Sequence, residues 1–408
     1  MEFYSTYIFI DVIVVFLLVL FSFFLIQLRV GSRVSHCLLA AFLLALSLSY
    51  MDGVLISLGY HFRYTYAHIV YLTMSFDFLV GPLLYLYMLS RMRADFKLRP
   101  VHAVHGLIFL LHFSFLFSRY HGKSLEQKRT LLETQQVFSQ TEILALTIVS
   151  NLHYLIYLML VITLLVKYQR ALKDFYSNVQ KKNLNWLLII SFGLLLGGLL
   201  RFLNNLLWLK VPHISFLQYV DLKLFAISSV LVFACVIVYK SLQQPEVLRM
   251  PADFFSASIH DQKQVTKHRL PAADTKPDEK YKTTRLEDSV KESYLARLNT
   301  YMRTSKPYLN ADLTLTELAE ALDIPLHHVS QIINSAYGKN FYDFINGYRL
   351  QDAAQALQDP VNKKYITQIM YDAGFNSKSV FNTAFKKEFG QTPSAFRKQS
   401  ASIKAVTG

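Results

Sequence analysis

Cysteine and charge are scarce in this sequence. Of its 408 residues, 2 are cysteine and 17% are charged, whereas 53% are hydrophobic. Cys37 and Cys235 lie within or beside long apolar runs, so we expect buried, inert thiols rather than a disulfide. A composition this apolar, with 31 phenylalanines and 25 tyrosines, excludes a pair of ordinary soluble domains.

Motifs of the common enzymes are also missing. The sequence has no Walker loop for phosphate, no nucleophile constellation, and no kinase or phosphoacceptor pattern. His102, His105 and His112 share one helical face, but no cysteine or carboxylate joins them, so we expect no metal site. The sequence therefore predicts a protein that is not an enzyme and requires no cofactor.

Long apolar runs fill the first 240 residues instead. Each is close to the ~20 residues that span the hydrocarbon core as a helix. The runs lie at about 6–28, 36–59, 67–90, 102–119, 142–166, 185–209 and 216–239. No basic segment precedes the first run and no small-residue cleavage signal follows it, which indicates a retained helix. Residues 1–240 are therefore predicted to form a seven-helix transmembrane bundle.

Lysine and arginine are unevenly distributed between the loops that join these runs. One set of alternating loops holds more of them than the other set, whose basic residues are Arg63, Arg119, Lys123, Lys128, Arg129 and Lys210. Because the richer side of a membrane protein faces the cytoplasm, the N-terminus is predicted to lie outside. Residues 241–408 then lie in the cytoplasm, and the chain is a multi-pass protein of the bacterial cytoplasmic (inner) membrane.

Polar side chains inside the predicted spans are costly in lipid and are therefore candidates for function. With the N-terminus outside, they fall in the outer half of the bundle or near its midplane. This placement suggests a ligand cavity that opens to the outside for an unidentified small-molecule signal. Its candidate residues are Asp77, Asn151, His153, Arg201, Asn204, Asp221 and Lys223. The alternative is a structural role, in which such side chains join neighbouring helices.

The segment after the apolar runs changes character twice. Residues 241–285 are polar and contain several prolines, which indicates a flexible cytoplasmic tether. Residues 286–304 then carry an apolar residue every three to four positions, which predicts an amphipathic connecting helix. Its apolar stripe can pack on the next domain or pair with a second copy of the chain, and the sequence leaves such a homodimer open.

The C-terminal segment, residues 305–400, contains one pattern twice. A short amphipathic helix, a tight turn and a second helix are predicted from Leu315 onward and again 51 residues later, from Ile366 onward. A helix around 341–357 joins the two copies. The sequence therefore predicts an all-α protein: a seven-helix transmembrane bundle followed by a cytoplasmic domain with two tandem helix-turn-helix units.

The residues of this segment resemble the AraC/XylS family of bacterial transcription regulators. The resemblance rests on LAEALDIPLHHVSQII, Tyr348-Arg349-Leu350, Gly374-Phe375, Phe389-Gly390 and Thr392-Pro393. It implies binding to double-stranded promoter DNA and control of transcription, and it leaves a contact with RNA polymerase open. It implies nothing about a ligand. A structural helical bundle that binds no DNA is the alternative reading.

The second helix of each unit is predicted to enter the major groove. Its exposed, DNA-contacting side chains would be His327, His328, Ser330, Gln331 and Asn334 in the first unit, and Ser377, Lys378, Ser379, Asn382, Thr383, Lys386 and Lys387 in the second. Residues 306–362 hold 3 basic and 7 acidic side chains, net −4, whereas residues 363–408 hold 8 and 2, net +6. The second unit should therefore supply more of the affinity for phosphate.

Together these features predict a membrane-bound one-component regulator of transcription. The bundle would sense a signal in the lipid bilayer, and the C-terminal domain would change its activity on DNA in response. Two other functions stay open for the bundle. It can be a transporter or membrane enzyme that carries a DNA-binding tail, or it can anchor a constitutive regulator to the membrane.

Overall fold

The computed structural model contains helices and no strand in the residues that it describes. These residues are 2–29, 32–92, 96–179, 192–193, 196, 198–200, 202–203, 228–236, 238–239, 288–359 and 361–407. The predicted all-α class is confirmed for them. The chain divides into two compact units, of residues 1–166 with 184–270 and of residues 167–183 with 271–408.

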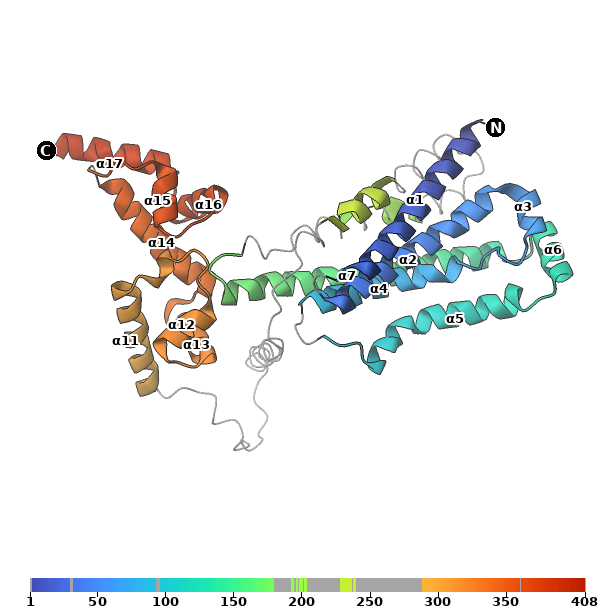
Figure 1. Ribbon diagram of the computed structural model, residues 1–408, viewed down its shortest axis with the longest axis horizontal. Helices are drawn as coiled ribbons and strands as arrows, with labels where there is room; N and C mark the ends of the chain where they lie inside the picture. The colour runs from blue at the N-terminus through green and yellow to red at the C-terminus, as the bar shows by residue number, and fades with distance from the viewer. Residues whose placement is uncertain are drawn as a thin grey trace. The chain divides into compact units, whose positions relative to one another are not determined.

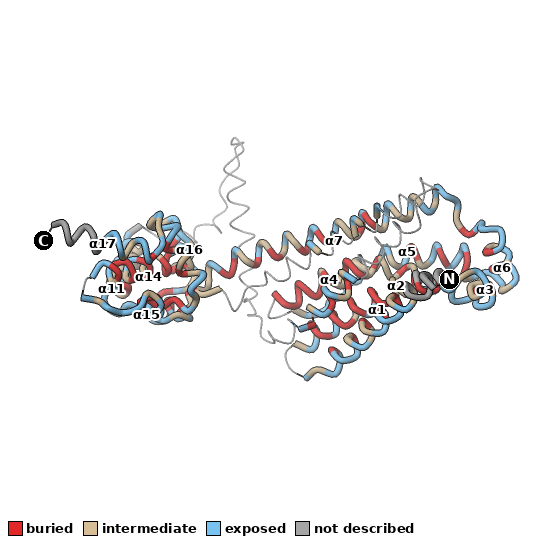
Figure 2. The backbone as a smooth tube through the Cα atoms, turned by 90° about the horizontal axis from the view of Figure 1, so that it is seen from above, coloured by how far each residue is buried: buried red, intermediate tan, exposed pale blue. Residues whose placement is uncertain are grey.

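The first unit is built from long apolar helices. Its elements are α1 (Glu2–Gln27), α2 (Arg33–Ser57), α3 (Gly59–Thr65), η1 (Met74–Phe76), α4 (Asp77–Met92), η2 (Pro100–Gly106), α5 (Leu107–Leu116), η3 (Phe117–His121), α6 (Leu125–Glu133) and α7 (Gln140–Phe175), which continues into the second unit (Figure 1). Helix α2 packs against both α1 and α4, and α5 packs against α4. The buried residues of α1, α2 and α4 form the core of this unit (Figure 2).

Within the part of the chain that the structure describes, four helices are long and apolar enough to cross a bilayer: Ile8–Gln27, Arg33–Asp52, Pro100–His121 and Gln140–Phe175. They correspond to the first, second, fourth and fifth predicted runs. The run predicted at 67–90 is helical only in its later part, because Tyr71 has a left-handed φ of 61° and α4 begins at Asp77. Most of the runs at 185–209 and 216–239 lies outside the described residues.

The second unit contains both helix-turn-helix motifs. Its helices are α11 (Asp288–Thr304), η6 (Pro307–Leu309), α12 (Leu315–Leu322), α13 (Leu326–Tyr337), α14 (Phe341–Gln358), α15 (Ile366–Asp372), α16 (Lys378–Phe389) and α17 (Pro393–Thr407) (Figure 1). Helices α12 and α13 form the first motif, and α15 and α16 form the second. Helix α14 joins them and contributes to two cores, one with α12 and α13 and the other with α15 and α16.

The two motifs start and stop at residues whose chemistry favours helix ends. Thr314 caps α12 with a reciprocal pair of hydrogen bonds to Glu317, at 3.1 Å and 2.8 Å. The second helix of each motif, α13 or α16, is called its recognition helix below. Both recognition helices end at a glycine in the left-handed conformation, Gly338 with φ 62° and Gly390 with φ 73°. The tandem arrangement predicted from the 51-residue repeat is therefore confirmed.

The apolar stripe of the connecting helix, α11, packs on the first motif. Leu298 and Met302 are fully buried there, and Tyr294, Leu295 and Tyr301 are partly buried against the same core. The sequence left two roles open for this stripe, packing on the next domain and pairing with a second copy of the chain. The described contacts correspond to the first role. A coiled coil through the same side chains would require α11 to leave this core.

Candidate DNA-binding surface

Every residue predicted to contact DNA lies on or next to a recognition helix, and none of them is buried. The exposed ones are His327, Gln331, Asn334, Lys378, Ser379, Thr383, Lys386 and Lys387, and the half-buried ones are His328, Ser330, Ser377 and Asn382. The buried face of each helix is apolar, with Val329, Ile332 and Ile333 on α13 and Phe381 and Phe385 on α16. This division places the polar face of each recognition helix at the surface of the domain.

The two histidines of the first recognition helix differ in their surroundings. The His328 ring lies 6.0 Å from the Tyr294 ring of α11, so this side chain is partly held against the core of its own domain. His327 is exposed, and its ring centroid lies 4.0 Å from that of His328. Partial desolvation by its neighbours, and then the adjacent His328, lower the pKa of His327, which favours the neutral imidazole. His327 is therefore better placed than His328 to hydrogen-bond a base edge.

A segment from the N-terminal half of the chain packs into the DNA-binding domain. This segment, residues 176–179, follows α7 and is called the strap below. Ser177 donates from its backbone N–H and its hydroxyl to the Leu313 carbonyl, at 3.2 Å and 2.7 Å. Tyr176 pairs with Thr314 in an antiparallel bridge, and Asn178 donates to the Asp312 carboxylate at 3.1 Å. The strap therefore runs antiparallel to the residues that lead into α12.

Arg349 of α14 is the centre of this contact. Its side chain is 1% exposed and donates to the carbonyls of Tyr308 at 2.7 Å, Asn310 at 2.7 Å and Ser177 at 3.2 Å. Further bonds reach the Ser177 hydroxyl, the Asn346 amide oxygen and the Ala311 carbonyl. Burial lowers the pKa of the guanidinium to about 10, which still leaves it charged at pH 7.

The strap also borders the second helix-turn-helix motif. Ser177, Asn178 and Val179 line one small cavity together with Gly374–Ser377 and Val380, which form the turn and the start of α16. The strap thus contacts the entry to α12, the joining helix α14 and the N-terminal end of α16. No sequence pattern marked residues 176–179, because Ser177 and Arg349 are 172 residues apart and meet only through tertiary structure.

The polar residues predicted to line a cavity in the bundle are brought together only in part. The Asp77 carboxylate accepts a hydrogen bond from Ser49, and His153 packs against Phe78, the neighbour of Asp77, with ring centroids 5.4 Å apart. Asn151 donates to Thr147 of its own helix at 2.7 Å. The other predicted residues, Arg201, Asn204, Asp221 and Lys223, lie outside the described residues. Among the described residues, no cluster of three or more metal-ligating side chains is present.

Comparison with known proteins finds relatives that match a part of the chain. Residues 318–399 match the model of a family described as "Helix-turn-helix domain". The transcriptional activator RhrA of Rhizobium meliloti is 31% identical over 100 residues, which are 24% of this chain and 32% of RhrA. The activator RhaS of Mannheimia succiniciproducens is 35% identical over 81 residues, which are 20% of this chain and 30% of RhaS.

A further relative is not named as a regulator. Histidine kinase P4 of Formosa agariphila is 44% identical over 55 residues, which are 14% of this chain and 4% of that protein. The chain thus spans about a third or less of the length of these relatives. The prediction of a C-terminal helix-turn-helix domain is confirmed, and the relatives in which it occurs include transcriptional activators.

Proposed function

We propose that this chain is a membrane-bound, non-enzymatic regulator that binds double-stranded promoter DNA and changes transcription in response to a signal. The observation that carries the proposal is the pair of recognition helices whose polar faces lie at the surface of the domain, which is similar to that of transcriptional activators. When a helix-turn-helix protein binds DNA, the N-terminal residues of its recognition helix contact base edges in the major groove. In this chain, α13 and α16 would fill that role.

The apolar faces of the first unit support insertion in a bilayer. Phe9, Phe16 and Phe23 recur every seven residues on one face of α1 and are 66%, 62% and 61% exposed. Leu152, Ile156 and Met159 form a similar exposed face on α7. Exposed apolar faces on helices of spanning length are expected where lipid covers them. The finer proposal is a seven-span bundle in the bacterial inner membrane, with the DNA-binding domain in the cytoplasm.

Binding to DNA is expected to depend on the lysines of the second recognition helix. Replacing Lys378, Lys386 and Lys387 by glutamine in the full chain, held in lipid nanodiscs, should weaken binding to all sequences alike. The slope of log K against log salt should fall by about 2.7, because each phosphate contact contributes roughly 0.9. The measurement is a salt titration on genomic fragments enriched by the unaltered protein.

A matched control for this titration is Arg303→Gln at the C-terminal end of α11, which removes one exposed positive charge that lies on neither recognition helix. It should leave the salt slope unchanged. A slope that stays the same in the triple variant would contradict the assignment of these lysines to phosphate contacts. Failure of the unaltered protein to enrich any fragment at low salt would overturn the DNA-binding proposal itself.

The strap offers a physical route from the bundle to the DNA-binding domain. Helix α7 is continuous from Gln140 to Phe175, and the strap follows it directly. Helix N-termini supply phosphate contacts in protein–DNA complexes, and the strap borders the N-terminal ends of α12 and α16. We infer that the docked strap and DNA compete for this surface, so that release of the strap raises the affinity for DNA.

A reversible cross-link tests this competition. Asn178 and Asp312 lie beside the Tyr176–Thr314 bridge, and their side chains are hydrogen-bonded at 3.1 Å, so this pair is the natural choice for a disulfide. Asn178→Cys with Asp312→Cys, in a background of Cys37→Ser and Cys235→Ser, should bind DNA about tenfold more weakly when oxidised than when reduced. Equal or tighter binding by the oxidised form would overturn the inhibitory role of the strap. The background variant alone should not respond to reductant.

A further inference from the structure

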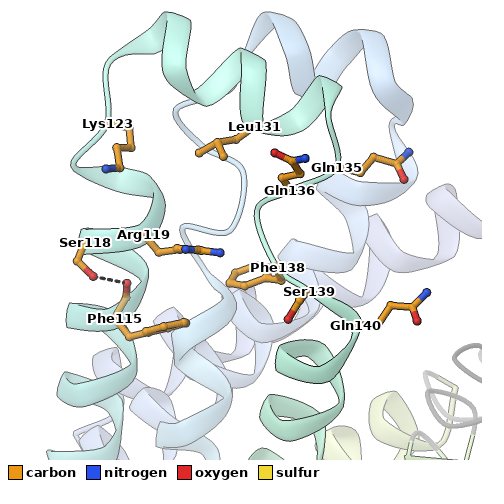
Figure 3. Close-up of a pocket in the computed structure, with 10 residues that line it drawn as sticks. All are labelled: Phe115, Ser118, Arg119, Lys123, Leu131, Gln135, Gln136, Phe138, Ser139 and Gln140. Atoms are coloured by element: carbon orange, nitrogen blue, oxygen red, sulfur yellow. Dashed lines mark hydrogen bonds between the residues drawn. The ribbon is translucent and has the colours of Figure 1, made fainter.

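We propose that a cavity at the η3–α6–α7 end of the first unit binds a hydroxylated organic anion of the size of a sugar acid. This inference names the chemical class of the signal and so rests on the sensing role proposed above. The cavity has a volume of about 970 Å³ and lies between the end of α5, η3, α6 and the loop that leads into α7 (Figure 3). Cavities of several hundred Å³ are typical of small-molecule sites.

Positive charge dominates the ionisable groups of this cavity. Arg119 and Lys123 line it, and no carboxylate does. Arg119 is held in place, since its Nε donates to the Val137 carbonyl at 3.1 Å and its Nη2 lies 3.7 Å from the Glu142 carboxylate. Lys123 has no ion-pair partner among the residues that the structure describes. Two cations and one carboxylate, which is paired with Arg119, leave a net positive charge at the cavity and favour a ligand that carries a negative charge.

The remaining lining groups favour a ligand with several hydroxyls. Gln135, Gln136 and Gln140 bring side-chain amides to the cavity, and Ser118 and Ser139 bring hydroxyls (Figure 3). Amides donate and accept hydrogen bonds, which matches the alternating needs of sugar hydroxyls. The Phe115 and Phe138 rings form the apolar part of the lining, with centroids 6.4 Å apart and planes 26° from parallel. Such rings can cover the C–H face of a sugar.

The backbone around the cavity adopts conformations that are uncommon outside functional sites. Arg119 lies in η3, Phe117–His121, which is a π-helical turn, and such turns are frequent at functional sites. Gln135 has a φ of 53°, in the left-handed region that non-glycine residues seldom occupy. Tyr71, with a φ of 61°, packs edge-on against Phe138 at 5.4 Å. Two of these irregularities thus lie in the lining of the cavity, and the third contacts that lining through Phe138.

The position of these cations also needs an explanation. In the proposed orientation, Arg119 and Lys123 lie on the outer side of the membrane, the side that is usually poor in lysine and arginine. A role in binding an external anion supplies a physical reason for them. In the sequence, Arg119 and Lys123 depart from the excess of lysine and arginine that is expected on the cytoplasmic side. Only the tertiary structure shows that the two side chains share a cavity with aromatic and amide groups.

The test is a direct binding measurement on the full chain in lipid nanodiscs, by calorimetry and without DNA. The probes are glucuronate, gluconate and glucose 6-phosphate, with glucose as the uncharged comparison. At least one of the three anions should bind, and glucose should bind at least about tenfold more weakly, the effect expected from one charge-assisted hydrogen bond. The Lys123→Gln variant should raise the dissociation constant of that anion by about tenfold, whereas Lys97→Gln, which removes a charge outside the cavity, should not.

Several results would overturn the proposal. They are an absence of binding by all three anions, equal binding of glucose, or equal losses in the two lysine variants. A second variant, Gln136→Ala, should weaken the anion and glucose alike, because it removes hydrogen bonds and no charge. Thermal melting of each variant in the nanodisc checks that the bundle is still folded. Because no DNA is present, failure here leaves the DNA-binding proposal standing and is distinguishable from its failure.

Discussion

Arg349→Met is expected to destabilise the DNA-binding domain by about 3–5 kcal/mol. The substitution removes six hydrogen bonds from a fully buried guanidinium and leaves the carbonyls of Tyr308 and Asn310 facing a thioether. Each buried carbonyl without a partner costs about 1–3 kcal/mol. Hydrogen exchange of the α14 amides in the full chain measures the loss, because these amides should then exchange far faster than in the unaltered protein.

The matched control for Arg349→Met is Arg303→Met on α11. Arg303 is exposed, so the same chemical change there should alter stability by no more than about 0.5 kcal/mol. Equal exchange rates in the two variants would show that the carbonyls around Arg349 contribute nothing to stability. A smaller intermediate effect is expected from Ser177→Ala, which removes only the strap hydroxyl from the same network.

Gly374→Ala is expected to disrupt the second helix-turn-helix motif by more than about 2 kcal/mol. Gly374 has a φ of 88°, where an L-residue is strained by roughly 1–2 kcal/mol. A Cβ there would lie 2.5 Å from the Tyr308 carbonyl oxygen and 2.9 Å from that of Leu309. These backbone atoms cannot move freely, because Arg349 holds the Tyr308 carbonyl at 2.7 Å.

The control for this glycine is Gly347→Ala within α14. A Cβ at Gly347 would meet only the Lys339 ammonium at 3.6 Å, the mobile end of a long side chain. Alanine in a helix interior should stabilise the domain by about 0.5–1 kcal/mol relative to glycine. The measurement is thermal unfolding, with DNA binding as the readout at each temperature. If both variants lost DNA binding at the same temperature, the close packing at Gly374 would not matter for stability.

These two predictions concern one structural junction. Arg349 and Gly374 both contact the segment 308–311, and the strap meets Arg349 from the other side. A double variant should therefore lose less than the sum of the single losses, because both changes release the same carbonyls. The junction connects α14 with the turn of the second motif, so its geometry controls how far apart the two recognition helices lie.

Sequence periodicity was enough for the elements whose stability is local. The tandem motifs were predicted because each amphipathic helix repeats its apolar residues at helical spacing. The structure adds the capping pair Thr314–Glu317, which also lies within one turn. The same periodicity placed the predicted DNA-contacting residues outside the buried faces, and in the structure eight of the twelve are exposed and four are half-buried. The start of the run at 67–90 was predicted wrongly, since hydropathy does not register that Tyr71 takes a left-handed φ or that the chain forms turns between α3 and η1.

The sequence by itself determined the long apolar helices, the second copy of the helix-turn-helix pattern and the location of the basic residues. Each depends on residues close together in the chain, where helical geometry fixes which side chains share a face. Only the tertiary structure decided that Ser177 meets Arg349, that α11 packs on the first motif, and that Arg119 shares a cavity with two phenylalanine rings. Those contacts join segments far apart in the chain. The local sequence around a buried arginine or a polar loop does not indicate which distant segment it contacts.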